Sequence, residues 1–339
     1  MKKLFIIISI VSVFLLVFSA TTVMASEKGL VYYLCPNQFD EMQTAAASMV
    51  KSSLEDAGYT CKVMTAGNED VNLQMNQIEN AISQNPKAIV IAAVDGTAVC
   101  SGVSTAHDAG IAVIAYDRTI SECSVEFTSI AGCKTMGLMA AQETVKLLKE
   151  KYGEVKGTVL DIMGDPGDSY TTMIEEGFQE AMKEYPNVEI DTKIAYGWEA
   201  VTAANIADDY LLVHSDTDLI FAHADHMAAA IASILQTKGY EKGDVLLIGT
   251  AGMPMGLQLI REGWMNATVE YSPKSLAEGI TMFLDDVLNK KALKLGPYEV
   301  MGIPAELSEK SYGPELKIAG SIIELENVDN PQLWGNQVK

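Results

Sequence analysis

The chain has 339 residues, of which 48% are apolar, and its 45 acidic and 24 basic side chains give a formal net charge of −21. This length suits two domains of about 100–200 residues rather than one core. The acidic excess argues against a nucleic-acid-binding protein, which needs a basic face against phosphate.

The first 25 residues have the pattern of a secretory signal peptide. Lys2 and Lys3 form a short basic end, residues 4–18 are an apolar run, and small or aliphatic residues precede a cut after Ala25. A membrane anchor is the less favoured alternative, because the run is shorter than the roughly 20 residues of a bilayer-spanning helix. No cysteine directly follows the cut, which argues against a lipid anchor. We expect a freely diffusing periplasmic protein with a mature charge of −23.

From residue 30 onward, apolar segments of strand length alternate with segments of helical periodicity. The first series predicts strands at 30–34, 60–64, 88–93 and 112–116, separated by helices at 42–57, 73–83 and 98–108. After a helix at 135–152, the second series predicts strands at 158–163, 190–195, 219–222, 245–249 and 267–270, separated by helices at 172–184, 200–213, 227–236 and 255–262. Strand–helix units of about 30 residues are typical of parallel sheets with crossover helices. The sequence therefore predicts an α/β protein with two doubly wound lobes.

Polar and aromatic residues gather where the predicted strands end. In doubly wound sheets a ligand binds beyond the carboxyl ends of the strands, so these exits are candidate binding segments. The exits are residues 35–40, 95–96, 117–118, 164–168, 196–198, 223–226 and 250–252. They supply the candidate solute-binding residues Asn37, Gln38, Phe39, Asp117, Arg118, Asp168, Trp198 and Asp225.

Several short motifs follow one another along the chain. They are Gln-Met-Asn-Gln-Ile-Glu-Asn at 74–80, Ala-Tyr-Asp-Arg at 115–118, Gly-Phe-Gln at 177–179, and a tail with Ile322, Glu-Asn-Val at 326–328 and Leu-Trp-Gly-Asn at 333–336. In this order they resemble the type I periplasmic binding proteins that deliver sugars to ABC importers, the xylose- and ribose-binding group in particular. The resemblance covers essentially the whole mature chain. It implies two lobes, joined by three crossover segments, that close around a solute by hinge bending.

The resemblance also implies how the chain is divided and what it works with. We expect the first lobe to comprise residues 26–131 and 273–300, and the second lobe with the tail to comprise 132–272 and 301–339. We further expect a monomer that binds a small polyhydroxylated molecule, hands it to a membrane permease, catalyses no reaction, and holds neither a cofactor nor a metal ion.

Within this family, the Asp-Arg pair at the fourth strand exit binds sugar hydroxyls, which implies that role for Asp117 and Arg118. A carboxylate accepts from two hydroxyl donors and a guanidinium donates as a planar fork, so the pair suits a polyol. The alternative is an ion pair that only fixes the loop. Trp198 stands where the family places an aromatic ring against the sugar face, and Phe39 could supply the opposite wall. Core packing is the alternative for both rings.

The sequence departs from the family pattern at several expected hydrogen-bonding positions. Gly132-Cys133 replaces Asp-Asn, Ala224-Asp225 replaces Asn-Asp, Ala251 replaces Asp, and Ser272 replaces Lys or Gln. A buried hydroxyl without a partner costs about 1–3 kcal/mol, so these changes would weaken binding of a fully hydroxylated hexose. Either compensating residues take part, namely Asn37, Asp168, His223 and His226, or the solute carries fewer hydroxyls than a sugar.

The odd number of cysteines, five, leaves at least one thiol outside an intramolecular disulfide. Cys100 and Cys123 follow the third and fourth strands and would meet at one sheet edge if those strands are neighbours. Their spacing also resembles a pair in receptors of the same fold that bind a furanosyl signal molecule, so we expect them to be bridged. Cys35 and Cys61 should lie at opposite ends of adjacent strands. Cys133 is then a thiol at the solute site, or an inert small side chain.

Two other functions compete with solute import. The protein could pass its closed form to a chemoreceptor or kinase, and local sequence does not separate this role from transport. It could also be an exported enzyme assisted by a metal ion on His223 and His226, with Asp225 as a third ligand. We disfavour the enzyme, because His223 should end a strand while His226 begins a helix, so their side chains should diverge.

Overall fold

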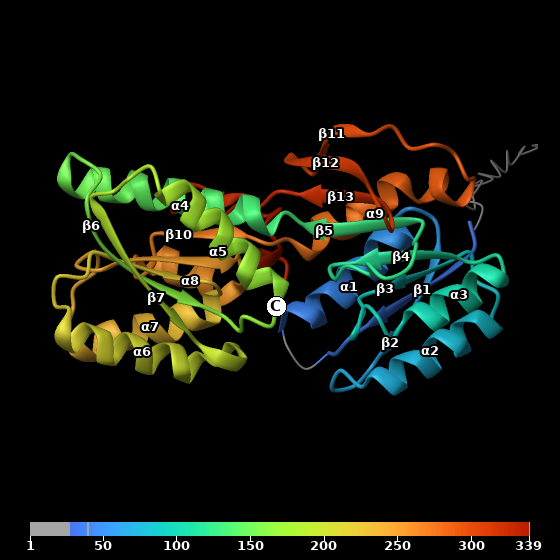
Figure 1. The fold of residues 1–339 in the computed structure, drawn as a ribbon, viewed down its shortest axis with the longest axis horizontal. Helices are drawn as coiled ribbons and strands as arrows, with labels where there is room; N and C mark the ends of the chain where they lie inside the picture. Colours follow the sequence, from blue (N-terminus) through green and yellow to red (C-terminus); the bar gives the residue numbers. More distant parts are fainter. Residues whose placement is uncertain (1–27, 39–40, 339) are drawn as a thin grey trace, which may run out of the picture.

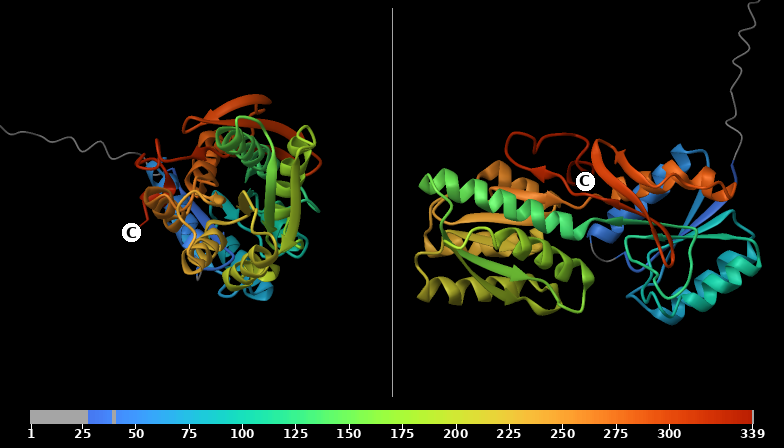
Figure 2. Two further views of the ribbon diagram at one scale, coloured as in Figure 1. Left: turned by 90° about the vertical axis from the view of Figure 1, so that its left-hand side faces the viewer. Right: turned by 45° about the horizontal axis from the view of Figure 1, so that its top comes forward.

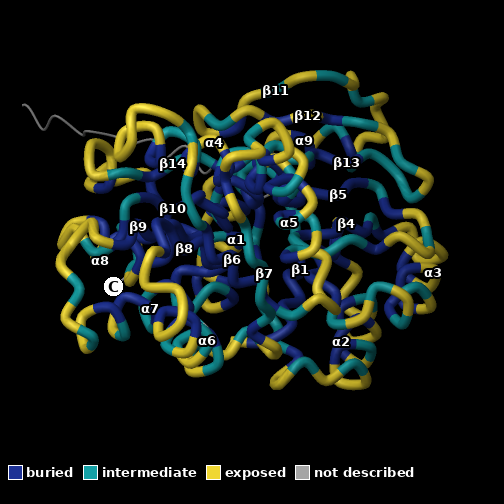
Figure 3. Tube along the Cα trace, turned by 60° about the vertical axis from the view of Figure 1, so that its left-hand side comes forward, coloured by how far each residue is buried: buried dark blue, intermediate teal, exposed yellow. Residues whose placement is uncertain are grey.

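The computed structural model of the protein describes residues 28–38 and 41–338. The predicted signal peptide and Phe39 therefore lie outside the described residues. Two α/β lobes lie side by side along the long axis of the molecule (Figure 1). The central strands of both sheets are buried, whereas exposed residues gather in loops, on the outer sides of helices and on the edge strand β11 (Figure 3). Over the described ranges, no helix combines the length and the apolar character needed to cross a bilayer.

The first lobe has, in its described part, an eight-stranded sheet with the order β2-β1-β3-β4-β5-β13-β12-β11. Its strands are β1 (Leu30–Cys35), β2 (Thr60–Thr65), β3 (Ala88–Ile91), β4 (Ala112–Tyr116), β5 (Phe127–Ala131), β11 (Gly296–Val300), β12 (Ile303–Lys310) and β13 (Gly313–Ile318). Its helices are α1 (Glu41–Asp56), α2 (Val71–Ser83), α3 (Cys100–Asp108) and α9 (Pro273–Leu288). Helices α2 and α3 cover one face of the sheet, and α1 and α9 cover the other.

The second lobe has, among the described residues, a six-stranded sheet with the order β7-β6-β8-β9-β10-β14. Its strands are β6 (Gly157–Met163), β7 (Val188–Ile194), β8 (Leu219–Ala222), β9 (Leu246–Ala251), β10 (Ala267–Glu270) and β14 (Ile322–Ile323). Its helices are α4 (Cys133–Tyr152), α5 (Ser169–Met182), α6 (Ala200–Val213), α7 (Asp225–Lys238) and α8 (Pro254–Glu262), with short turns η1 (Tyr196–Trp198) and η2 (Trp334–Asn336). Helices α4 and α5 cover one face, and α6, α7 and α8 cover the other.

Both lobes repeat one doubly wound order: β2-β1-β3-β4-β5 matches β7-β6-β8-β9-β10. The central strands β1, β3, β4 and β8 are almost entirely apolar, as expected for strands buried on both faces. In β1, for example, Tyr33 packs toward α1 and α9, and Leu34 packs toward α2 and α3. The expected fold class is therefore confirmed, although both sheets are mixed, since β11, β12 and β14 pair antiparallel to their neighbours.

Within the described residues, the chain passes between the lobes three times. It leaves β5 for α4 at Gly132, leaves β10 for α9 through Tyr271 and Ser272, and leaves β13 for β14 at residues 319–321. These segments are the three crossovers that the sequence resemblance implies.

The predicted boundary at residue 300 is wrong for residues 303–318. Strand β13 pairs parallel to β5, and β12 pairs antiparallel to β13, so this hairpin extends the sheet of the first lobe. The chain returns to the second lobe only with β14, which pairs with β10. Figure 2 shows these C-terminal segments, in orange and red, running along both lobes.

Two glycines let helices α4 and α5 cross at backbone contact. A Cβ atom on Gly177 would lie 2.0 Å from the carbonyl oxygen of Lys134, and one on Gly137 would lie 1.9 Å from that of Ile174. Any larger side chain would force the helices apart, because real atoms do not approach so closely. The glycine of the Gly-Phe-Gln motif therefore holds α5, and the loop before it, against α4.

Candidate functional site

Asp117 begins the loop that leaves β4, and its carboxylate is held from two sides. Gln43 of α1 donates from Nε2 to Oδ2 at 3.2 Å, and the phenol of Tyr271 donates to Oδ1. The backbone of Asp117 has φ of 66°, a left-handed conformation that is strained for a residue with a side chain. Such strain persists only where the surroundings enforce it, so the first lobe places this carboxylate in one orientation.

Arg118 binds neighbouring strand exits. Its Nη2 donates to Glu69 Oε1 at 2.8 Å, and its Nη1 donates to the carbonyl oxygen of Ala93 at 3.3 Å. Asn37, which follows β1, donates from Nδ2 to the same oxygen of Glu69 at 3.0 Å. Partial burial alone would raise the pKa of Glu69, but these hydrogen bonds lower it. The guanidinium therefore connects, directly or through Glu69, the loops after β1, β2, β3 and β4. This agrees with the alternative in which Arg118 serves to fix the loop.

Two glutamines of α2 hold further exit loops. Gln74 is fully buried; its Nε2 donates to the carbonyl oxygen of Ala92 at 3.0 Å, and its Oε1 accepts from the amide of Val94 at 2.8 Å. Gln77 donates to the carbonyl oxygen of Thr65 at 2.6 Å. The motif at 74–80 thus fixes the loops after β3 and β2.

Asp168 and Tyr170 extend from the second lobe where β6 leads into α5. Asp168 is exposed and caps the helix, since it accepts from the amide of Tyr170 at 2.8 Å. The phenol of Tyr170 lies 3.2 Å from Oγ1 of Thr250, which belongs to β9. Burial is the main cause that raises the pKa of Tyr170, so this phenol stays protonated.

Trp198 packs its ring directly on the backbone of Gly164. A Cβ atom on Gly164 would lie 2.3 Å from the indole, so only glycine fits beneath the ring. Trp198 has φ of 58°, and its carbonyl oxygen lies 2.8 Å from Nε2 of His226. The indole therefore packs on the loop after β6, and the start of α7 holds the backbone of Trp198.

An aromatic series joins the second lobe to Asp117. The ring of Trp198 lies 5.8 Å from that of Tyr170, and Tyr170 lies 5.6 Å edge-on from Tyr271. Tyr271, in the second crossover, completes the series through its hydrogen bond to Asp117. We call Asp117, Arg118, Cys133, Asp168, Tyr170, Trp198 and Tyr271 the interlobe site.

Electrostatic interactions also reach from one side of the interlobe site to the other. Burial alone would lower the pKa of Arg118, but Glu69, Asp117 and Asp168 together raise it. Burial, assisted by the charges of Asp117 and Asp168, raises the pKa of Cys133 to about 12. Cys133 is therefore a neutral, buried thiol between two carboxylates rather than a nucleophile.

The structure does not bring every predicted residue to this site. Asp225 is fully buried, where it accepts from the amide of Met253 at 2.7 Å and from the hydroxyl of Thr268 at 2.7 Å. Ser272 caps α9 by accepting from the amide of Ser275 at 3.2 Å. Contrary to the expectation from sequence, Asp225 supports the start of α8 and Ser272 supports the start of α9.

The other residues that the sequence predicts for the site lie in several different environments. Asn37 is buried and serves the Glu69 contact, Gln38 is exposed, and Phe39 lies outside the described residues. His226 contacts Trp198, whereas His223 is buried beneath α5 with other partners. The side chains of His223, Asp225 and His226 therefore do not converge, as the strand-to-helix change predicts.

Tyr170 and Tyr271 are the site residues that the sequence did not reveal. Tyr170 lies beside the loop at 164–168, within the segment where the family pattern places Arg or Asn. Tyr271 immediately precedes Ser272 at the end of the last parallel strand of the second lobe. Their nearness to strand exits was a signal, but exit position alone does not tell which side chain turns toward the other lobe.

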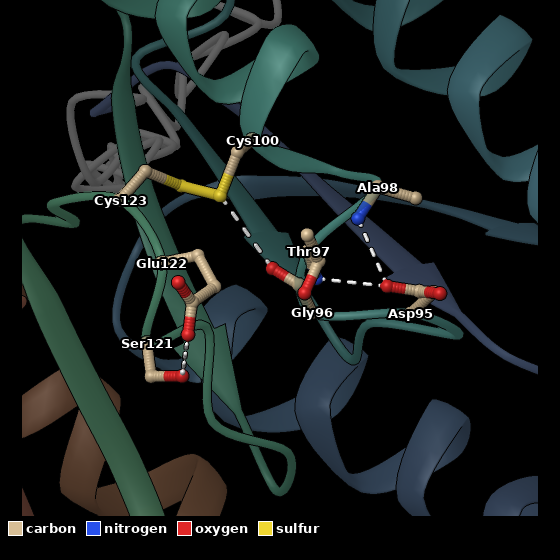
Figure 4. Close-up of a disulfide and its surroundings, with 8 residues drawn as sticks. All are labelled: Asp95, Gly96, Thr97, Ala98, Cys100, Ser121, Glu122 and Cys123. Atoms are coloured by element: carbon tan, nitrogen blue, oxygen red, sulfur yellow. Dashed lines mark hydrogen bonds between the residues drawn. A yellow bond between two sulfur atoms is a disulfide. The ribbon is translucent and has the colours of Figure 1, made fainter.

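A disulfide joins the loops after β3 and β4, with Cys100 and Cys123 Cα atoms 5.7 Å apart (Figure 4). This is the pairing expected from sequence. In the loop after β3, Asp95 accepts hydrogen bonds from the amides of Thr97 and Ala98 at 2.8 and 2.9 Å. The bridge thus braces the loop that starts with Asp117 and Arg118. Cys35 and Cys61 lie at opposite ends of β1 and β2, also as expected.

A wide hollow in the first lobe lies at the other end of its strands, away from the interlobe site. Its lining includes Lys28, Lys87 and Asp285, near the amino ends of β1 and β3. Since ligands of doubly wound sheets bind at the carboxyl ends, the interlobe site and not this hollow is the candidate functional site.

Known proteins resemble this chain over most of its length. A family model described as a periplasmic binding protein domain matches residues 31–292. The chain belongs to the periplasmic binding protein family. The matched range begins in β1 and ends just beyond α9, so it includes every residue of the interlobe site.

Individual relatives of this periplasmic binding protein include an import binding protein and a sugar-binding periplasmic receptor. The ribose import binding protein RbsB of Bacillus subtilis is 26% identical over 233 residues, which cover 68% of this chain and 73% of that protein. The multiple sugar-binding periplasmic receptor ChvE of Rhizobium radiobacter is 26% identical over 271 residues, covering 75% and 76%. A solute-binding protein from Bacillus halodurans with bound myo-inositol shares the fold, with a TM-score of 0.71, 22% identity, and coverage of 91% and 99%.

Proposed function

We propose that this periplasmic binding protein is the solute receptor of an ABC importer and binds a small polyhydroxylated molecule in the interlobe site. The observation that carries the proposal is the placement of Asp117. Its carboxylate is oriented by Gln43 and Tyr271 and stands next to the aromatic series of the second lobe. A carboxylate that binds hydroxyls beside rings that pack on apolar C–H faces is the chemistry of sugar and cyclitol recognition.

The binding mechanism is a shift between open and closed populations. A solute that contacts Asp117 on the first lobe and Trp198 on the second makes both contacts only when the lobes are closed. It therefore stabilises the closed state by its differential affinity for that state. The three crossovers are the hinges, and the closed form is the one that a membrane permease recognises.

The chemistry of the interlobe site also restricts the solute. Cys133 is a neutral thiol, and the ends of the neighbouring strands β8 and β9 carry the buried Ala224 and Ala251, whose side chains have no hydrogen-bonding group. Each solute hydroxyl facing such a group would lose a partner on leaving water, at about 1–3 kcal/mol. We therefore favour a pentose or a deoxysugar, which carry fewer hydroxyls, over a fully hydroxylated hexose.

The test is a calorimetric binding screen on protein purified from the periplasmic fraction, with ribose, arabinose, allose, apiose, myo-inositol and glycerol. At least one of these should bind at one molecule per chain. Asp117→Ala should weaken that binding by at least about tenfold, because it removes a charged acceptor. Asp108→Ala, an exposed aspartate at the end of α3, is the matched control. The proposal fails if no polyol binds, or if both variants bind equally well.

We further propose that the protein is exported and works as a monomer without enzymatic activity. The family matched here is periplasmic, and the relatives named above are binding proteins. Mass spectrometry of the purified protein should give a chain that begins at Ser26, and sedimentation should give a single chain with and without solute. A chain that keeps residues 1–25 would contradict export with removal of the signal peptide, and a stable dimer would contradict the monomeric state.

A further inference from the structure

A cluster of three ionisable side chains lies inside the second lobe, between the sheet and α5. Asp161 belongs to β6, Glu175 to α5, and His223 follows β8. Nε2 of His223 lies 3.1 Å from Oδ1 of Asp161 and 3.8 Å from Oε2 of Glu175. One ligand atom from each residue lies within 4.8 Å of the other two. The cluster is separate from the residues that form the interlobe site.

Each of these three atoms is buried, and none has a hydrogen-bond partner when both carboxyl groups are ionised. They are Oδ1 of Asp161, Oε2 of Glu175 and Nε2 of His223; a proton on Glu175 would let the two carboxyl groups bond to each other. Asp161 and His223 are 0% exposed. Buried polar atoms are almost always paired, so three such atoms around one point indicate a site for a bound cation or a shared proton.

The charge of the cluster gives the same indication. Among the described ion pairs, Asp161 and Glu175 pair only with His223, and no lysine or arginine joins them. Burial raises the pKa of Asp161 to about 6, and burial with Asp161 raises that of Glu175 to about 8, whereas burial lowers the pKa of His223 to about 4. A neutral imidazole beside two carboxyl groups leaves negative charge that only a proton or a metal cation can offset.

Neighbouring side chains hold the three groups in place. Nδ1 of His223 lies 2.7 Å from Oγ1 of Thr171, and the hydroxyl of Thr192 donates to Oδ2 of Asp161 at 3.2 Å. The hydroxyl of Thr192 also lies 3.5 Å from Oε1 of Glu175. Metal ligands are typically fixed in this way, with the second ring nitrogen of histidine and the outer carboxylate oxygens hydrogen-bonded.

The distances suit a small transition-metal ion. Bonds of about 2.0–2.2 Å in a tetrahedral site place ligand atoms roughly 3.4 Å apart, and the two separations measured from His223 lie on either side of that value. One imidazole and two carboxylates are ligands for zinc, whereas calcium requires six to eight oxygens. The side chain of Glu175 is 19% exposed, which provides a route for an ion to enter.

We propose that Asp161, Glu175 and His223 bind one divalent transition-metal ion, zinc by its ligand preference, as a structural site of the second lobe. The sequence predicts no metal here, because Asp161 and Glu175 lie far from His223 along the chain. Thr171 connects the cluster to the interlobe site: it contacts His223, accepts from the amide of Gly164 at 3.0 Å, and follows Tyr170. The ion would therefore stabilise the start of α5, which carries Asp168 and Tyr170.

The first experiment measures metal content and melting temperature on the whole protein purified without chelator. We expect about one zinc per chain, a fall in Tm after extraction with EDTA, and recovery by at least about 3 °C with zinc but not with calcium. Cobalt bound in place of zinc should give visible absorption bands. Protein that contains no metal and whose Tm does not respond to zinc or manganese would overturn the proposal.

The second experiment separates a metal ion from a shared proton. Glu175→Gln should abolish the zinc-dependent rise in Tm, whereas Glu176→Gln, a change at an exposed neighbour on the same helix, should preserve it. If the cluster instead shares a proton, Glu175→Gln should have the same Tm as the metal-free wild type, and zinc should not change the Tm of the wild type. Should Glu175→Gln not fold, Asp161→Asn and the wild-type zinc titration decide the same question.

Discussion

The phenol of Tyr271 donates a hydrogen bond to the carboxylate of Asp117. Tyr271 belongs to the second crossover, whereas Asp117 belongs to the fourth strand exit of the first lobe. This single contact connects the proposed solute anchor to a hinge. Any rotation of the second lobe that moves the crossover changes what surrounds the carboxylate.

Replacing Tyr271 by Phe should weaken solute binding about tenfold, equivalent to about 1.4 kcal/mol. The substitution keeps the ring against Tyr170 but removes a donor to a charged acceptor, a loss of the size expected for such a bond. Calorimetry with the best polyol measures the change. Tyr298→Phe, which loses only a hydroxyl bonded to the Lys294 carbonyl on an exposed strand, is the control. Tighter binding by Tyr271→Phe would mean that the phenol competes with the solute.

Trp198 should report solute binding by its fluorescence. Its indole is only partly buried and lies at the interlobe site, whereas Trp334 is fully buried and Trp264 lies near Lys242. We expect the emission change on binding to vanish in Trp198→Phe and to persist in Trp264→Phe. Trp198→Ala should additionally weaken binding at least about tenfold, because it removes the packing surface. An unchanged emission response in Trp198→Phe would exclude the indole from the site.

Removing the disulfide should destabilise the first lobe. The bridge between Cys100 and Cys123 closes a loop with a sequence separation of 23, which corresponds to about 3 kcal/mol in the chain-entropy model. The double serine variant should unfold at lower urea concentration than the wild type. A reducing agent should shift the wild type to the same midpoint and leave the variant unaffected. If reduction shifts both proteins equally, the effect does not come from this bridge.

The stability of the second lobe should fall as the pH rises from about 4.5 to about 7. Burial, together with the charge of Glu324, raises the pKa of Glu143 to about 7, even though Lys146 lies 3.2 Å from its carboxylate. The folded state therefore keeps a proton that the unfolded chain has lost, so each increase in pH across this window favours unfolding.

The measurement is urea unfolding at pH 5 and pH 8. Glu143→Gln should reduce the fall in unfolding free energy, whose maximum slope for one proton is about 1.4 kcal/mol per pH unit. Glu150→Gln, at an exposed position on the same helix, should leave the slope unchanged. An equal slope in all three proteins would show that Glu143 titrates normally in the folded state.

Most parallel strands of the two sheets could be predicted because they are apolar on both faces, whereas β5, with Thr128 and Ser129 at its centre, was not predicted. Strands β11 to β13 were not predictable in this way. Strands β11 and β12 have exposed residues along their length at the outer end of the sheet, and Pro304 and Pro314 lie in β12 and β13. Proline is tolerated at edges, where it also resembles a loop in the sequence. Such strands can be recognised only from the strand with which they pair, which for β13 is β5, far away along the chain.

Asp117 and Asp225 show why the candidate site could be predicted only in part from the sequence. Both lie close to the ends of parallel strands, and both are charged. Asp117 faces Gln43 and Tyr271, but Asp225 turns inward because the amide of Met253 and the hydroxyl of Thr268 bind it. Position at a strand exit follows from hydrophobic periodicity, whereas the direction of a side chain depends on donors contributed by remote segments.

The pairing of β5 with β13 also determines when the first lobe can be completed during biosynthesis. The ribosome finishes β5 at Ala131 but its neighbour β13 only at Ile318, after the parallel strands of the second lobe have been made. Until then β5 is an open edge that can pair wrongly with other chains. The sheet of the first lobe therefore cannot be completed until residues up to Ile318 are available to fold, so both lobes reach their final form together.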